Sequence, residues 1–277
     1  MRGPQILVDT MSIATARGSG TVPWQYHSRS DSHSKVACWT LLFDLLLECD
    51  ALRDAAVQGR IGFGINYEMV GPINKTLDLV ITLVDPERDL SRVRSFASLA
   101  KSYGIAMSAQ DSAALATLPT LHEDREHDAS EVAIALEAKA CMTEHLKSLP
   151  RLHAEILATG YLARQAQRQC ITVSYSLVNA AAEFRTPSSS TGKVNRHNQP
   201  TDARRVVDMI ELAIPVAAKV QEIGYDVVGV SVINCMNDGS PVTLVDDPAM
   251  APTTKDRLHY TRMVRNICSE FRARFKR

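Results

Sequence analysis

The chain has 277 residues, of which 45% are hydrophobic, 22% charged and 5% aromatic. It is long enough to bury one large core or two modest ones, and its composition excludes a disordered, collagen-like or disulfide-scaffold protein. The 31 Lys and Arg residues balance 31 Asp and Glu residues. This balance excludes a protein that holds nucleic acid by bulk positive charge alone.

The sequence predicts a cytoplasmic protein without a membrane partner. No apolar run reaches the roughly 18 residues that a membrane-spanning helix needs. The N-terminal residues lack the charged, apolar and small-residue regions of a signal peptide. The cysteines are scattered without a CxxC pair, which predicts buried thiols rather than a zinc site. They are Cys38, Cys49, Cys141, Cys170, Cys235 and Cys268.

An N-terminal arm, a helix and a β-hairpin are predicted over the first part of the chain. Residues 1–32 contain Gly, Pro and many Ser and Thr, so we expect an arm or loop rather than core. From Ser34 the run SKVACWTLLFDLLLECDAL places apolar residues at helical spacing. Residues 60–70 and 75–84 are strand-like and are separated by the turn-forming GPIN, which predicts an antiparallel hairpin.

Strands that alternate with helices predict a single α/β domain, with one mixed sheet covered by helices on both faces. No linker or internal repeat divides the chain. Two polar segments interrupt the pattern: 121–131, expected to be a solvated acidic loop, and 186–201, expected to be mobile. The remaining predicted elements are helices at 89–103 (closed by Gly104), 144–167 (with Pro150 in its first turn or at a break), 202–223 and 256–275, and strands at 131–141, 170–181 and 226–236.

Three ionisable residues lie in predicted strands that are otherwise apolar. Side chains alternate along a strand, so Glu137 and Lys139 share one face of the strand EVAIALEAKAC. Asp78 has a similar setting in LDLVITLV. Because burying a lone charge costs several kcal/mol, these groups must be paired or lie at an open edge of the core. A salt-bridged strand edge is the plain structural alternative.

Together, these three residues suit metal-assisted hydrolysis of a phosphodiester. If Asp78 and Glu137 lie on adjacent strands, two carboxylates face one point and repel unless a divalent cation sits between them. Lys139 would then hold and polarise a water or a phosphate oxygen. The cation and the ammonium would neutralise the negative charge that develops on the phosphoryl group.

These residues, in this order, resemble the PD-(D/E)XK nuclease superfamily, in which an Asp at the end of a hairpin precedes an apolar strand with Glu-x-Lys. The surrounding sequence is similar to type II restriction-endonuclease-like proteins of bacteria from about residue 27 to the C-terminus. Leu77 replaces the nominal proline, and 59 positions separate Asp78 from Glu137. The matching segments are LDLVI, VAIALEAKA, HSKVACW (33–39) with FDLL (43–46), the hairpin from Gly64 to Leu79, EAKACMTEH (137–145) and PRLHAEI (150–156).

The resemblance implies an α/β/α nuclease domain over 33–277, with an insertion at 85–130 and catalytic residues Asp78, Glu137 and Lys139. It implies one or two magnesium ions, with manganese as a substitute. In many relatives the first core helix adds an acid to the metal site, which makes Glu48, and less so Asp44, a candidate ligand; a solvated helix face explains both more simply. We expect a homodimer, because cutting two antiparallel strands requires two active sites.

Contacts to double-stranded DNA are expected from basic and imidazole side chains near this site. Backbone N–H groups at the start of a helix bind phosphates, and polar, flexible segments can contact both phosphates and base edges. The structural alternative is that these residues cap helices or lie on solvent-exposed helix faces. The same alternative applies to residues 255–277, which contain eight Lys and Arg residues and could also contact DNA. The candidates are His33, Lys35, His145, Arg151, Lys193 and Arg196.

The leading interpretation is therefore a magnesium-dependent DNA endonuclease of restriction or anti-phage defence type. Two alternatives stay open: a catalytically inactive nucleic-acid-binding module with the same fold, and a nuclease that acts on RNA. An unrelated phosphate-ester enzyme is disfavoured because no P-loop, dinucleotide fingerprint, nucleophile elbow or HExxH motif is present. The sequence leaves open the recognition sequence and whether a cognate methyltransferase or a defence-system partner exists.

Overall fold

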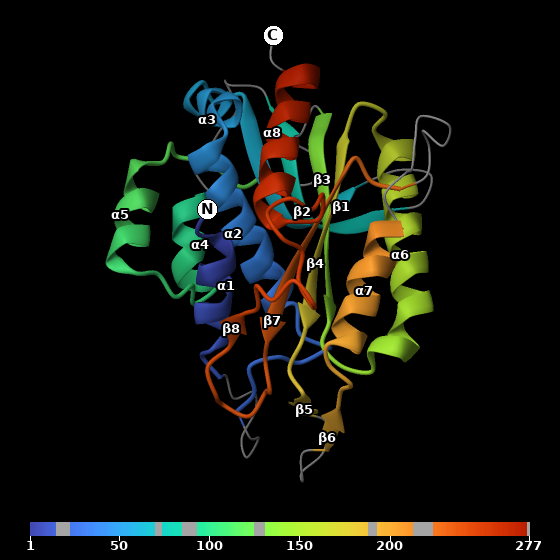
Figure 1. Ribbon diagram of the computed structural model, residues 1–277. Helices are drawn as coiled ribbons and strands as arrows, with labels where there is room; N and C mark the ends of the chain where they lie inside the picture. Colours follow the sequence, from blue (N-terminus) through green and yellow to red (C-terminus); the bar gives the residue numbers. More distant parts are fainter. Residues whose placement is uncertain are drawn as a thin grey trace.

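The protein is a mixed α/β structure in which helices cover both faces of a central six-stranded sheet (Figure 1). The computed structural model describes residues 1–14, 23–69, 74–84, 93–124, 131–187, 193–212 and 224–275. The central sheet contains, in spatial order, β1 (Ile61–Met69), β2 (Lys75–Leu83), β3 (Glu131–Cys141), β4 (Ile171–Asn179), β7 (Val227–Asn234) and β8 (Thr243–Leu244).

The sheet changes direction at β3. β1, β2 and β3 are antiparallel neighbours, whereas β3, β4 and β7 run parallel to one another and β8 closes the edge antiparallel to β7. The parallel pairs require crossover connections, and helices supply them. A separate two-stranded ribbon pairs β5 (Glu183–Arg185) with β6 (Val194–Arg196).

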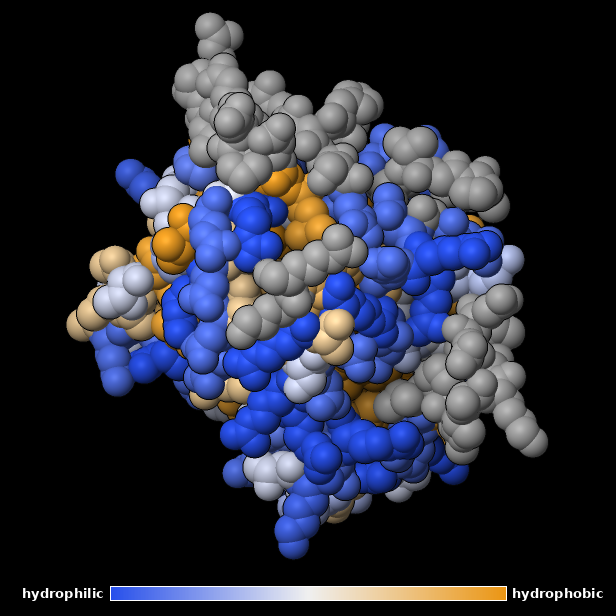
Figure 2. Space-filling view, turned by 90° about the horizontal axis from the view of Figure 1, so that it is seen from above, coloured by the Kyte–Doolittle hydropathy of each residue, from blue (hydrophilic) through white to orange (hydrophobic). Residues whose placement is uncertain are grey.

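Two layers of helices bury the two faces of the sheet. One core packs α1 (Gly3–Met11), α2 (Ser32–Glu48) and α8 (Tyr260–Phe275) against β3 and β4, and the other packs α6 (His145–Ala166) and α7 (Thr201–Leu212) against β4 and β7. All nine residues of β4 are buried, as a central parallel strand requires. The face in Figure 2 is mainly hydrophilic with small hydrophobic patches. The other helices are α3 (Asp50–Val57), α4 (Phe96–Ser102) and α5 (Ala109–Thr117).

Most of the strands and helices predicted from periodicity are confirmed. The antiparallel hairpin forms, although residues 70–73 of its turn lie outside the described part of the chain. β3 has the predicted bounds, and the helix predicted from Ser34 begins two residues earlier. The helix predicted at 89–103 is confirmed over Phe96–Ser102, whereas residues 93–95 are not helical and 89–92 lie outside the described part. Gly104 follows the C-cap Tyr103 with a φ of 64°, the left-handed conformation that ends a helix.

The prediction that residues 1–32 form an arm outside the core is wrong for their first part. Residues 3–11 form α1, whose Ile6 and Leu7 are fully buried. The carboxylate of Asp44 on α2 accepts hydrogen bonds from the backbone N–H groups of Arg2 and Gly3, each at 2.8 Å. A carboxylate 41 residues away thus caps this short helix. Local sequence alone carries no sign of that cap.

The cysteines differ from expectation at one pair. Cys49 at the end of α2 forms a disulfide with Cys268 on α8, across 219 residues of chain. The spacing of the cysteines did not predict this bond, because only packing of α8 beside α2 brings the two together. The other four cysteines are buried free thiols, as expected.

The segment between the hairpin and β3 contains more structure than its polar composition predicts. Ser108 and Asp111 form a capping box that starts α5. The expected solvated loop at 121–131 is wrong for its described part: Leu121 and Asp124 are buried, and Glu123 pairs with Arg94 at 2.7 Å. Residues 125–130 lie outside the described part.

Other boundaries also differ from the predictions. Pro150 lies inside α6 rather than in its first turn or at a break. Part of the expected mobile segment 186–201 is β6, and residues 188–192 are not described. α7 is described to Leu212, and residues 213–223 of its predicted length lie outside the description. Among the described residues, no helix has the length and apolarity that crossing a membrane would take.

Candidate functional site

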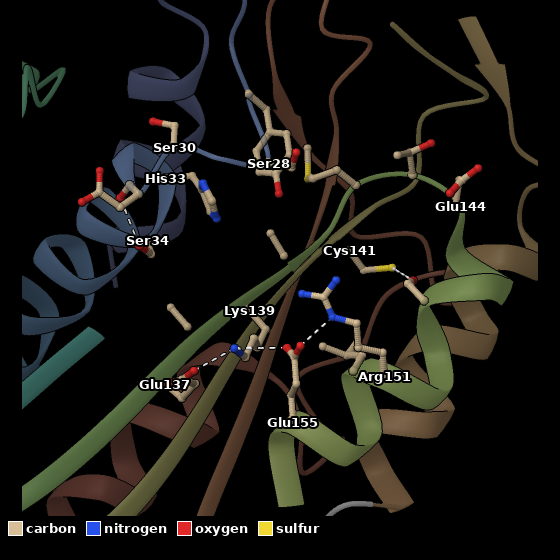
Figure 3. Close-up of a pocket in the computed structure, with 18 of the residues that line it drawn as sticks. Ser28, Ser30, His33, Ser34, Glu137, Lys139, Cys141, Glu144, Arg151 and Glu155 are labelled. Atoms are coloured by element: carbon tan, nitrogen blue, oxygen red, sulfur yellow. Dashed lines mark hydrogen bonds and ion pairs between the residues drawn. The ribbon is translucent and has the colours of Figure 1, made fainter. Parts of the chain in front are cut away.

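A cleft of about 600 Å³ opens at the carboxyl end of β3. The first turns of α2 and α6 line it, together with the chain that precedes α2 (Figure 3). β3 is where the sheet changes from antiparallel to parallel pairing. In open α/β sheets, ligands commonly bind in the crevice outside the carboxyl ends of the strands.

The pairing of β2 with β3 brings Asp78 to Glu137. The antiparallel register runs through Val80 opposite Ala135 and Leu79 opposite Leu136, and the next position of each strand is Asp78 and Glu137. At this point the Asp78 carboxylate, rather than a backbone carbonyl, accepts the backbone N–H of Ala138 at 2.8 Å. The side chain of Asp78 thus ends the ladder and is held beside β3.

Asp78 is less acidic than an ordinary aspartate. Burial and the negative charge of Glu137 raise the pKa of Asp78 to about 6, although the N–H of Ala138, the ammonium of Lys139 and the Ser34 side chain lower it. The repulsion from Glu137 means that the two acids act on each other electrostatically. A carboxylate whose charge is disfavoured in this way gains from a nearby cation.

Glu137 is the most deeply buried acid of the cleft, with 4% of its surface exposed. Its Oε1 atom lies 2.7 Å from the Nζ atom of Lys139 and 3.3 Å from that of Lys75. Its Oε2 atom is buried and has no hydrogen-bond partner in the described part of the protein. A buried carboxylate oxygen without a partner costs free energy, and a cation would remove that cost.

Lys139 lies between two carboxylates. Its Nζ atom contacts Glu137 and lies 3.4 Å from Oε2 of Glu155 on α6. Burial lowers the pKa of Lys139, but the charges of Glu137, Glu155 and Asp78 raise it more, so the pKa lies above its ordinary value. The amine is therefore a fixed positive charge at neutral pH. Arg151 in turn contacts Glu155 at 2.6 Å.

The cleft carries more acids than bases, and this balance bears on a metal. Five carboxylates line it, against the three permanent cations Lys139, Lys147 and Arg151. No group of three or more His, Cys, Asp or Glu side chains is arranged to hold a metal within the described part of the chain. Asp78 and Glu137 nevertheless fit Mg²⁺, which takes one or two protein carboxylates and fills its remaining positions with water and substrate phosphate. The orphaned Oε2 atom of Glu137 supports that fit.

Five of the predicted site residues line the cleft: Asp78, Glu137, Lys139, His33 and Arg151. The ring of His33 packs against that of Tyr26 at 4.7 Å between centroids. Burial lowers the pKa of His33 to about 4, so this imidazole is neutral at pH 7 and offers a hydrogen bond rather than a charge. The Arg151 side chain is 82% exposed at the rim.

The structure does not bring Glu48 or Asp44 to the site. Ser34 marks the end of α2 that lines the cleft, whereas Glu48 is the last residue of the helix, about 21 Å further along its axis at 1.5 Å per residue. Asp44 is fully buried and caps α1. The fold therefore gives Asp44 a structural task and places the exposed Glu48 too far away to share a cation with Asp78.

Two of the residues predicted to bind DNA are engaged elsewhere. Lys35 pairs with Asp31 at 2.6 Å and does not line the cleft. His145 is buried, and its Nε2 atom lies 2.8 Å from the backbone carbonyl oxygen of Asn179. His145 therefore connects the start of α6 to the end of β4, and its burial keeps it from a duplex.

Arg196 ends β6 of the two-stranded ribbon, and Lys193 directly precedes β6. The ribbon lies at the carboxyl end of the sheet but outside the lining of the cleft (Figure 1). The carbonyl of Lys193 accepts the N–H of Thr186 at 2.9 Å. The side chain of Arg196 is 85% exposed and lies 3.2 Å from Glu183. The ribbon thus presents Arg196 to solvent.

Sequence reasoning missed three residues at the site. Lys75 and Glu155 were not selected because each is an ordinary charged residue at a strand start or on a helix. Ser34 was named only as the start of a helical run, yet it lies beside Asp78. The single available signal was the Arg151–Glu155 spacing of four residues, which predicts an ion pair on α6 but not its contact with β3.

No family model, no curated protein and no solved structure matches this chain.

Proposed function

We propose that the chain is a magnesium-dependent endonuclease that hydrolyses phosphodiester bonds of DNA, with a restriction-endonuclease-like fold of the PD-(D/E)XK superfamily. One observation carries the proposal: buried Glu137 has an oxygen without a partner, next to Asp78 and beside the ammonium of Lys139. The salt bridges of Glu137 to Lys139 and Lys75 engage only its Oε1 atom, which leaves Oε2 available to a cation. The motif resemblance supports the same reading.

The architecture supports the proposal at the level of layers and strand order. An antiparallel hairpin delivers Asp78, and the adjoining strand delivers Glu137 and Lys139 before the sheet continues in parallel pairing. Helices cover both faces, as the resemblance implies. The long segment between Asp78 and Glu137 leaves the sheet and forms α4 and α5 before the chain returns as β3.

Each side chain has a definable task in this reaction. Asp78 and Glu137 would hold Mg²⁺, which lowers the pKa of the attacking water and neutralises charge on the phosphoryl group. Lys139 places its ammonium beside the phosphate and stabilises the charge that builds on the non-bridging oxygens. A water oxygen bonds to phosphorus, one ester P–O bond breaks, and the leaving oxygen takes up a proton.

Charge in the cleft makes DNA binding dependent on the cation. The five lining carboxylates would repel a polyanion, so tight binding requires that some of their charge be neutralised. Arg151 at the rim and Arg196 on the ribbon would add contacts to the phosphate backbone. Two copies of the chain would be needed to cut both strands in one encounter.

Cleavage of plasmid DNA with and without Mg²⁺ tests the proposal. We expect cleavage by the wild-type protein in Mg²⁺ and none in EDTA. Glu137→Gln should lose cleavage at least a hundredfold, because it removes the charge that the cation requires. Glu131→Gln is the matched control, since Glu131 starts the same strand at the end remote from the cleft.

The cleavage products and a DNA-binding assay distinguish the remaining hypotheses. Discrete fragments would indicate sequence-specific restriction, and a smear would indicate a non-specific effector. DNA binding without cleavage in Mg²⁺ or Mn²⁺ would replace the proposal by a non-catalytic binding module. Cleavage of RNA but not of DNA would assign the same site to a ribonuclease. Full activity of Glu137→Gln would show that the chemistry lies elsewhere.

A further inference from the structure

A third carboxylate, that of Glu155 on α6, is linked to the proposed metal site through Lys139. Its Oε2 atom lies 3.4 Å from the Nζ atom of Lys139, and its Oε1 atom accepts a hydrogen bond from the Nε atom of Arg151 at 2.6 Å. Figure 3 shows the chain of contacts from Glu137 through Lys139 and Glu155 to Arg151. The ammonium of Lys139 is therefore shared between its own strand and the helix layer.

The helix holds Glu155 in place over β3. Positions 152, 155 and 156 share one face of α6, because residues three and four apart lie side by side on a helix. Leu152 and Ile156 on that face are buried in the core that α6 forms against the sheet. Their burial fixes the rotation of α6 and directs Glu155 to the Lys139 side. Arg151, one turn earlier, holds the carboxylate from the solvent side.

The two carboxylates around Lys139 differ in what else they must do. Glu137 is the buried acid with the unpartnered oxygen and would bind the cation. When it does so, the positive charge of the metal comes close to the ammonium and weakens its hold on Glu137. Glu155 lies on α6 rather than on the strands that carry the two acids. Its attraction for Lys139 therefore persists when Glu137 binds a cation.

We propose that Glu155 is a positioning residue, which keeps the ammonium of Lys139 in the cleft while Glu137 is engaged with a divalent cation. The inference rests on the proposed nuclease function and deepens it. Glu155 acts through Lys139 and touches no reacting atom. Without it, Lys139 is free to extend into solvent when the cation binds, and the phosphate loses its ammonium partner.

Two substitutions and one control test this role. Glu155→Gln keeps the size of the side chain and removes its charge, whereas Glu155→Asp restores the charge. Glu144→Gln is the matched control, because Glu144 also lines the cleft next to α6 but pairs with Lys147 at 3.1 Å rather than with Lys139. Thermal unfolding of each variant verifies that the fold is retained.

The first measurement does not require cleavage. NMR detects the side-chain ammonium of a lysine held in an ion pair, and Lys139→Met assigns the signal. We expect the Lys139 signal to persist in the wild-type protein when Mg²⁺ is added at constant pH. In Glu155→Gln the same addition should broaden it beyond detection. Glu155→Asp should restore it in part, and Glu144→Gln should leave it unchanged.

The second measurement is the rate of DNA cleavage. Glu155→Gln should lower kcat about tenfold or more with KM changed less than threefold, and Glu155→Asp should recover part of the loss. A Lys139 signal that survives Mg²⁺ in Glu155→Gln would overturn the inference, as would an unchanged kcat. If the wild-type protein binds Mg²⁺ but cleaves no nucleic acid, the proposed function fails, and the NMR result alone decides the role of Glu155. A wild-type protein that binds no divalent cation overturns both.

Discussion

The charge of Asp78 should lower the stability of the metal-free protein, so removing that charge should stabilise it. Burial and the charge of Glu137 raise the pKa of Asp78 from 3.8 to about 6. One pKa unit corresponds to about 1.4 kcal/mol, so a rise of two units corresponds to about 3 kcal/mol of lost folding free energy for the ionised form. The loss is absent below about pH 4, where the carboxyl is protonated in both states. It grows between about pH 4 and 6 and is complete above.

Asp78→Asn isolates this effect. The amide oxygen of Asn keeps the ability to accept the N–H of Ala138, while the charge is gone. In EDTA at pH 8 the variant should exceed the wild-type protein by about 1–3 kcal/mol in free energy of unfolding. At pH 3.5 the free energies of unfolding of the two proteins should be equal. Urea unfolding at several pH values, followed by fluorescence of buried Trp39, measures the difference.

Asp226→Asn is the control, because its expected effect on the free energy of unfolding has the opposite sign. Burial raises the pKa of Asp226, but the N–H of Thr172 and the guanidinium groups of Arg274 and Arg164 lower it more, so the pKa is below its ordinary value. Asp226→Asn should therefore destabilise the protein above about pH 4.

Saturating Mg²⁺ at a hundred times its Kd should add about 2.7 kcal/mol to the free energy of unfolding of the wild-type protein and little to that of Asp78→Asn. An Asp78→Asn protein that is less stable than wild type at pH 8, or a difference that ignores pH, would refute the reasoning.

Three further outcomes are expected. Replacing Cys49 and Cys268 by Ala should lower the free energy of unfolding by about 2–5 kcal/mol, because the bond closes a loop of 219 residues; a reductant should destabilise the wild-type protein but not the double variant. Asp44→Ala should cost about 2–4 kcal/mol by leaving two N–H groups without an acceptor, whereas Glu48→Ala should change stability by less than about 0.5 kcal/mol and leave cleavage intact. Neutralising Lys193 and Arg196 together should reduce the salt dependence of DNA binding by about two phosphate contacts; an unchanged slope would place the duplex on another surface.

The features that could be predicted from the amino-acid sequence are those that depend on residues close together in the chain. Apolar runs bounded by turn-forming residues identified the hairpin and β3, whose residues are mostly buried in β2 and β3, and the alternation of side chains along a strand showed which of them share a face. The same alternation put Glu137 and Lys139 on one face, and their 2.7 Å contact confirms that placement. Apolar spacing located α2, and a glycine in the left-handed conformation ended α4 where expected. All these features depend on neighbours within a few positions.

Contacts between residues far apart in the chain could not be predicted and are visible only in the folded protein. Asp44 caps α1 across 41 residues, Lys75 reaches Glu137 across 62, and Cys49 joins Cys268 across 219. Glu155 meets Lys139 only because α6 folds back over β3 with its apolar face buried. The position of Glu48 also depends on packing. The first turn of α2 lines the cleft, so Glu48, the last residue of this long helix, lies far from it. Such contacts depend on how the layers pack, and packing is a property of the whole chain rather than of any local pattern.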